Sequence, residues 1–200
     1  MNTPGTLLDF LHEWSGWFCH KLPERSPHSE FDMFPVCFRC AGWQLGLFAS
    51  YVTIFAGGNW RGRFPSLRVS LMCVALMLPL VIDGIGNALH GWNSPGWFRG
   101  LTGLGVGLGI PWLLAPLAHS TEPMGTASLE NLRPLLWPAV FGSVAVLSLE
   151  FGAGPMVFRA LAVAAAAGWF VFVGHFLFAL FCSYVSPTLP PPRQLPSPSA

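Results

Sequence analysis

Charged side chains are scarce in this sequence of 200 residues. Asp, Glu, Lys and Arg together make up 10% of the chain, against about 25% in soluble domains. Apolar residues make up 52%, and the formal net charge is only +1. A nearly neutral chain offers no basic surface, so we expect no nucleic-acid partner. The composition instead predicts an integral membrane protein surrounded by the lipid bilayer.

Catalytic and processing signals are also missing. The sequence has no Ser-His-Asp pattern and no H-E-x-x-H motif, so it assigns no catalytic residue and leaves open whether the protein is an enzyme. Its five cysteines are too few and too scattered for a small disulfide scaffold. The first residues lack the basic stretch and cleavage pattern of a signal peptide, so we expect Met1 to belong to the mature chain.

A glycine-rich run, GLGVGLG at residues 103–109, lacks the surroundings of a nucleotide-binding loop. No predicted strand precedes it, and no phosphate-binding lysine follows it. Gly103 and Gly107 are four residues apart, as are Gly105 and Gly109. Small residues at this spacing are typical of membrane helices in close contact, so the run predicts close helix packing.

Five apolar segments predict an all-α fold, a polytopic membrane bundle of about five transmembrane helices. A helix of about 20 apolar residues is long enough to cross a bilayer. The segments are residues 35–56, 67–82, 98–118, 134–154 and 157–185. We expect residues 19–185 to form the membrane domain. Residues 186–200 contain six prolines, and we expect them to be a disordered tail.

Residues 1–18 predict a separate amphipathic helix, with its helical part over residues 3–18. Leu7, Leu11 and Trp14 fall on one side at helical spacing, whereas Asp9 and Glu13 lie toward the other. This segment is too short and too charged to cross the membrane. We assign it to the membrane interface, with packing over the mouth of the bundle as the alternative.

The stretch CHKLPERSPHSEFDMFPVCFRCAGWQLG, residues 19–46, is the polar, cysteine-bearing part of the chain. Cys37 and Cys40 are three positions apart at the start of the first predicted span, which places both sulfurs on one side of a helical turn. The positive end of the helix dipole is expected to lower the pKa of both thiols. Thiolate is the form that both metal binding and disulfide exchange require.

Three interpretations of the cysteines remain open. In the first, Cys19, Cys37 and Cys40 bind zinc, or copper as Cu(I), with His20 or His90 as the fourth ligand. In the second, the cysteines exchange disulfides as a membrane redox protein. In the third, Cys19 forms a structural disulfide with one of the other two.

The motifs resemble a family. The sequence CHKLPERS followed by FPVCFRCAG resembles C-H-x-x-P-x-R-S and P-x-C-x-R-C-T-G in the prokaryotic membrane family known as domain of unknown function 2085. A second block, D-G-x-x-Q, then S-N and R-x-x-T-G, is matched by residues 83–103. Ala41, Gln44 and Asn87 stand where the family has Thr, Tyr and Gln. The family has no agreed activity, so the resemblance implies a fold and a site location only.

Two predicted crossings separate Cys40 from Asp83, so both motif blocks lie on the same membrane face. The candidate polar site on that face consists of Glu24, Arg25, Arg39, Asp83, Asn87 and Arg99. One interpretation is that these residues form ion pairs that hold the loops against the helix bundle, such as Glu24 with Arg25 and Asp83 with Arg99. The other is that they contact a substrate. In the second case, the three arginines favour a small anionic ligand such as a phosphate or carboxylate.

The positive-inside rule gives the orientation. Lys and Arg are divided five against five between the two predicted faces, and two against five once Arg25, Arg39 and Arg99 are left out as site residues. We therefore expect a multi-pass protein of the cell membrane with the turn around Arg61 in the cytoplasm. The cysteine block then lies on the outer face. The sequence assigns no oligomeric state.

Overall fold

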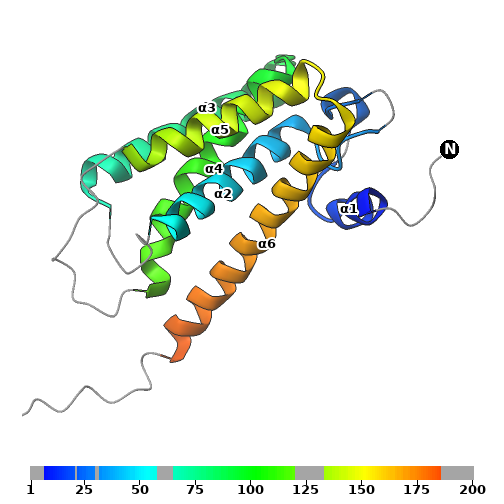
Figure 1. The fold of residues 1–200 in the computed structure, drawn as a ribbon. Coiled ribbons are helices and arrows are strands. Elements are labelled where there is room, and N and C mark those ends of the chain that lie inside the picture. The colour runs from blue at the N-terminus through cyan, green and yellow to red at the C-terminus, as the bar shows by residue number, and fades with distance from the viewer. Residues whose placement is uncertain (1–6, 21, 30–31, 58–64, 120–132, 186–200) are drawn as a thin grey trace, which may run out of the picture.

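The computed structural model describes residues 7–20, 22–29, 32–57, 65–119 and 133–185, and in this part of the chain helices are joined by loops (Figure 1). The predicted all-α class is confirmed. Within the described residues, β-type pairing is limited to an isolated bridge between His28 and Met33. The elements are α1 (Leu7–Ser15), the 3₁₀ turn η1 (Pro23–Arg25), α2 (Phe38–Ala56), α3 (Leu67–His90), α4 (Gly96–His119), α5 (Arg133–Glu150) and α6 (Pro155–Val185).

Helices α2 and α4 pack along each other and form the centre of the bundle. Helix α3 packs on α4, whereas α5 and α6 each contact both central helices. Figure 1 shows α1 beside the beginning of α6, at the end of the molecule where α2 begins. The loop that joins α1 to α2 therefore lies at one end of the bundle.

The glycines of α4 bring this helix into close contact with two neighbours. A Cβ atom at Gly103 or Gly107 would overlap a backbone carbonyl oxygen of α2. A Cβ atom at Gly105 or Gly109 would instead overlap a carbonyl oxygen of α3. The prediction of close packing is confirmed, and each pair of glycines serves a different neighbouring helix.

Two predicted helix ends differ from the observed ones. Helix α2 begins at Phe38 with Cys37 as its N-cap, rather than at Pro35. Helix α3 continues through Asp83 to His90, although the sequence predicted its end at residue 82. Asp83 therefore lies inside the helix, where Arg39 pairs with it. Gly91, with φ of 61°, ends the helix in the left-handed conformation that favours glycine.

Helix α6 packs on the bundle through small residues. Ala162, Ala165 and Ala166 are buried with Phe158, whereas Ala160 is exposed. Gly168 lies against the backbone of α2, where a Cβ would overlap the carbonyl oxygen of Gln44. Small side chains therefore let α6 approach α2 closely.

The bundle exposes large apolar side chains and buries polar ones. Exposed Leu, Ile, Val, Phe and Trp side chains lie along α3, α5 and α6, whereas Gln44, Asp83, Arg99 and Thr102 are buried. Among the described helices, Leu67–Leu89 and Pro155–Cys182 are long and apolar enough to cross a bilayer, and Pro134–Glu150 is a shorter apolar helix. Length and composition therefore identify two candidate spans and do not confirm five.

Helix α1 packs on the bundle and also presents an apolar outer face. The ring of Trp14 stacks on Phe170 with centroids 4.6 Å apart, and Phe18 stacks on Trp169 at 5.0 Å. The side chain of Trp17, by contrast, is 90% exposed. The predicted positions 3–6 and the Pro-rich tail at 186–200 lie outside the described residues.

Candidate metal centre and adjoining polar network

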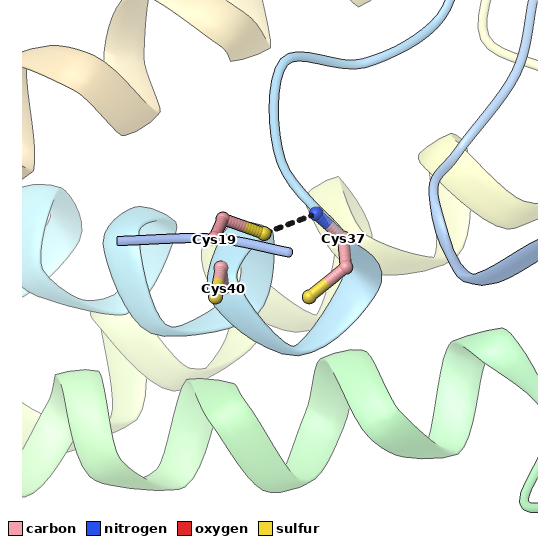
Figure 2. A group of neighbouring side chains, drawn as sticks. All are labelled: Cys19, Cys37 and Cys40. Carbon is pink, nitrogen blue, oxygen red and sulfur yellow. Dashed lines mark hydrogen bonds between the residues drawn. The ribbon is translucent and has the colours of Figure 1, made fainter. Parts of the chain in front are cut away.

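Three cysteines from two segments meet at the start of α2 (Figure 2). Cys19 comes from the loop after α1, Cys37 is the N-cap of α2, and Cys40 lies in the first turn of that helix. Their sulfur atoms all lie within 4.8 Å of one another. The group brings together the three cysteines that the sequence proposed as metal ligands.

The start of α2 holds the group together. The first backbone N–H groups of a helix have no partner within it, and Cys37 donates its N–H to Sγ of Cys19 at 3.3 Å. Cys19 is 6% exposed and belongs to the hydrophobic core that also contains Leu11 and Phe34. A sulfur that accepts a backbone N–H in an apolar setting is suited to carry negative charge when a cation is close.

The pKa of Cys37 differs from the sequence prediction. Hydrogen bonding with Cys19 and then burial raise the pKa of Cys37, although its bond with Cys40 partly opposes this. The predicted lowering by the helix dipole is therefore wrong for Cys37 without a metal, because a neighbouring thiol and desolvation outweigh the dipole.

The cysteines are not joined by a disulfide. All five lie in the described part of the chain, and each is a thiol. Cys73 is buried in a separate apolar cluster with Ile54, Val69 and Trp112, as expected for a packed core residue. The structural-disulfide interpretation is therefore not the arrangement that the structure adopts.

The two histidines proposed as fourth ligands have different positions. His20 is exposed, and the group of sulfurs does not extend to it. His90 is the last residue of α3, and the structure does not describe its side chain. Among the residues that the structure describes, the ligand group consists of three sulfurs.

A buried carboxylate lies at the centre of the second motif block. Asp83 is 1% exposed and forms an ion pair with Arg39, which stands between Cys37 and Cys40 in α2. Oδ1 of Asp83 accepts hydrogen bonds from Ser94 Oγ at 2.5 Å and from Asn87 Nδ2 at 3.1 Å. This ion pair joins the two motif blocks, as expected for residues on one membrane face.

Arg99 extends the network into α4. The guanidinium is buried, with the residue 5% exposed. Its Nε donates to Ser94 Oγ at 3.1 Å, and its Nη2 donates to Oδ1 of Asn87 at 2.9 Å and of Asn93 at 3.1 Å. The sequence proposed an Asp83–Arg99 pair, but Arg39 pairs with Asp83 and Ser94 connects the carboxylate to Arg99.

Sequence reasoning left Ser94 out of the candidate site. The signal that could have found it was its place in the second motif block, between Asp83 and Arg99. Ser94 is buried and both donates and accepts in this network, so a hydroxyl is required there.

The remaining proposed polar residues lie nearer the surface. Glu24 and Arg25 are exposed in η1. The carboxylate of Glu150 lies beside Gly96 at the start of α4, so the end of α5 reaches the same face.

The geometry is compatible with a soft metal ion. Sulfurs around a tetrahedral zinc ion at about 2.3 Å are separated by about 3.8 Å. The three sulfurs lie within 4.8 Å of one another, so a small movement would bring them to one ion. Thiolate ligands suit zinc and Cu(I), and both fit this donor set.

The fold and site define an all-helical protein with an apolar exterior, a buried polar network and a group of three cysteines. The chain belongs to the family described as "Predicted membrane protein (DUF2085)", whose model matches residues 19–113. It is also 32% identical over 103 residues to an uncharacterized protein of Methanothermobacter thermautotrophicus (strain Delta H). That alignment covers 52% of this chain and 89% of the relative. No solved structure matches the chain. The protein is therefore a predicted membrane protein of unknown function.

Proposed function

We propose that this chain is a multi-pass membrane protein that binds one zinc or copper ion through Cys19, Cys37 and Cys40 at one membrane face. The observation that carries the proposal is the approach of three sulfurs to within 4.8 Å at a helix start. His20 and His90 remain the proposed candidates for a fourth ligand. A metal ion would displace the thiol protons and bind the sulfurs as thiolates.

The position of α2 and α4 supports a bundle of five spans. These central helices are shielded by α3, α5 and α6, so they need not be as apolar as helices that face lipid. Gln44 and Ser50 of α2 and Thr102 of α4 are buried, and such residues lower the hydropathy of a helix without contacting lipid. With 19 residues, α2 is about 28 Å long, close to the hydrocarbon thickness of about 30 Å.

Helix α1 is proposed to lie at the membrane interface. Its buried side contacts α6, and its outer side exposes Leu7, Phe10 and Trp17. Tryptophan is typical of the headgroup level, where its ring is apolar and its N–H is hydrated. We therefore propose the domain division into residues 1–18, 19–185 and 186–200.

The cysteine face is proposed to lie outside the cell. Arg39 and Arg99 take part in the buried network and so do not count as loop charges. Without the motif arginines, basic residues favour the opposite face, which carries Arg68 at the start of α3. An outer position would expose the site to metal ions of the cell envelope.

A thiol redox function is the weaker alternative. Disulfide exchange needs an attacking thiolate, and the raised pKa of Cys37 disfavours that form. Metal binding does not need a thiolate in advance, because the ion itself displaces the protons. The raised thiol pKa of Cys37 therefore supports metal binding over disulfide exchange.

Metal analysis of the full chain purified in detergent, combined with thiol counting, tests the proposal. We expect about one zinc or copper ion per chain, lost on Cys37→Ser or Cys40→Ser. Cys182→Ser in α6 is the control and should retain the metal. Protein with no metal and an oxidised cysteine pair would contradict the proposal and favour the redox alternative.

A further inference from the structure

One of the three sulfurs reaches the cysteine group from outside the helix that carries the other two. Cys37 and Cys40 lie at the start of α2, so the backbone of one helix sets their separation. Cys19 lies 18 positions before Cys37 and follows α1. The place of its sulfur therefore depends on how α1 and the turn after it dock on the bundle.

Ser15, the last residue of α1, connects the segment of Cys19 with the segment of Cys37. Its carbonyl oxygen accepts the backbone N–H of Cys19 at 3.0 Å. Its hydroxyl donates to the carbonyl oxygen of Pro35, two residues before Cys37, at 2.7 Å, whereas the alternative acceptor, the carbonyl oxygen of His12, is 3.1 Å away. Ser15 is 1% exposed, so water does not compete for these bonds.

Two further contacts dock α1 on the bundle. Nε2 of His12 donates to the carbonyl oxygen of Met33 at 2.8 Å, which ties the helix to the loop before α2. The ring of Trp14 stacks on Phe170 of α6. Helix α1 is therefore held by that loop and by α6, and none of these contacts involves a sulfur atom. Each contact can be removed while all three cysteines are kept.

We propose that α1 is the positioning element of the metal centre: its docking, through Ser15 and Trp14, brings Cys19 to Cys37 and Cys40. This inference rests on the metal centre proposed above and adds residues that act on it without binding the ion. With α1 undocked, two sulfurs remain at the start of α2, which is an incomplete set for a structural zinc site. The effect is reciprocal, so zinc stabilises the docked position of α1 by the same factor by which docking strengthens zinc binding.

Hydrogen–deuterium exchange of the full chain in detergent tests the reciprocal effect. Exchange of the backbone amides of α1, residues 7–15, is followed by mass spectrometry with and without Zn(II). We expect zinc to slow this exchange by about fivefold or more, because opening of α1 must then release a ligand. Peptides of α3, which carries none of the three cysteines, are the internal control and should change little. Unchanged exchange of α1 in the zinc-loaded wild-type chain would overturn the proposal.

Ser15→Ala removes the hydroxyl that joins α1 to the carbonyl oxygen of Pro35. Alanine favours a helix more than serine does, so the substitution does not weaken α1 itself. Zn(II) is titrated into the full chain in detergent, in competition with a chromophoric chelator. We expect zinc affinity to fall by about two- to tenfold, the range for the loss of one hydrogen bond. Wild-type affinity in this variant would contradict the proposal.

Trp14→Leu removes the ring that stacks on Phe170, and we expect zinc affinity to fall by about three- to tenfold. Trp17→Leu is the matched control, because the same substitution is made three positions later at a side chain that is 90% exposed. It should leave zinc affinity unchanged. Equal losses in the two variants would mean that the apolar character of the segment, and not its docked side, sets the affinity. That result would overturn the proposal.

The Cys19→Ser chain separates the positioning of a ligand from general support of the fold. Positioning acts through the sulfur of Cys19, so Trp14→Leu should weaken zinc binding in the wild-type chain but not in the Cys19→Ser chain. Losses of the same size in both chains would show that α1 only supports the bundle, and would overturn the proposal. If Cys19→Ser binds zinc too weakly to be measured, the exchange of α1 in the wild-type chain decides the question.

Failure of the metal centre and failure of this inference give different results. If the wild-type chain binds neither zinc nor copper, the metal centre is wrong and the role of α1 falls with it. If the wild-type chain binds zinc, and both Ser15→Ala and Trp14→Leu bind it as tightly, only the role of α1 is wrong.

Discussion

At the scale of single residues, Asp83 shows how a carboxylate is accommodated in an otherwise apolar bundle. Arg39 supplies the opposite charge, and Ser94 and Asn87 supply hydrogen bonds to Oδ1. The sequence predicted that Asp83 and the cysteine loop share a face, because two crossings separate them. It did not predict Arg39 as the partner, since that choice depends on how α2 and α3 are rotated toward each other.

The Cys37 thiol should react slowly near neutral pH in the metal-free protein. The pKa of Cys37 is raised, so its thiolate fraction at pH 7 is smaller than that of an ordinary cysteine. Alkylation followed by mass spectrometry should show a rate that rises with pH and reaches half its maximum above the value for the unfolded chain. That shift in pH separates the pKa effect from slow access, which lowers the rate at every pH.

The control for this measurement is the same chain unfolded in detergent and denaturant, where the Cys37 thiol should show an ordinary cysteine pKa. A folded metal-free chain whose half-maximal rate falls below that of the unfolded chain would contradict the prediction. It would show that the helix dipole dominates the neighbouring thiols after all.

At the scale of elements, α4 is positioned by its glycines. Its two glycine pairs face different helices, and each allows a backbone carbonyl of the neighbour to approach. The sequence predicted close packing from the four-residue spacing. It could not assign the partners, because the same spacing is compatible with any neighbouring helix.

Gly107→Ala should destabilise the bundle by about 1–3 kcal/mol, because its Cβ would overlap the carbonyl oxygen of Trp43. Thermal unfolding in detergent, followed by the fluorescence of the tryptophans, measures the change. Gly174→Ala in α6 is the matched control, since a Cβ there meets nothing within 4 Å. Alanine is a better helix former than glycine, so that variant should be neutral or slightly more stable. Equal effects at both positions would contradict close packing of α4.

At the scale of the whole molecule, apolar side chains lie outside and a polar network lies inside. This arrangement agrees with the family of predicted membrane proteins to which the chain belongs. The most apolar long helices, α3 and α6, lie at the periphery, whereas α2 and α4 lie between their neighbours. Hydropathy alone therefore identifies fewer spans than the proposed bundle contains.

Reporter fusions should place residues 57 and 152 on opposite sides of the membrane. The five-span proposal puts the end of α2 in the cytoplasm, and the turn between α5 and α6 outside with the cysteines. A fusion after Gly57 should therefore be active with a cytoplasmic reporter, and one after Gly152 with a reporter that requires export. The same reporter active at both positions would contradict the proposed topology, because three crossings, α3, α4 and α5, separate them.

The sequence by itself determined the helical class and the membrane character. Composition and apolar length are properties of the chain that do not depend on how the helices contact one another. Only the tertiary structure decided that Cys19 joins Cys37 and Cys40, that Arg39 pairs with Asp83, and that α3 continues to His90. These features depend on how far each helix is rotated about its axis and shifted along it. Close packing at the small residues sets both, and no local sequence pattern encodes them.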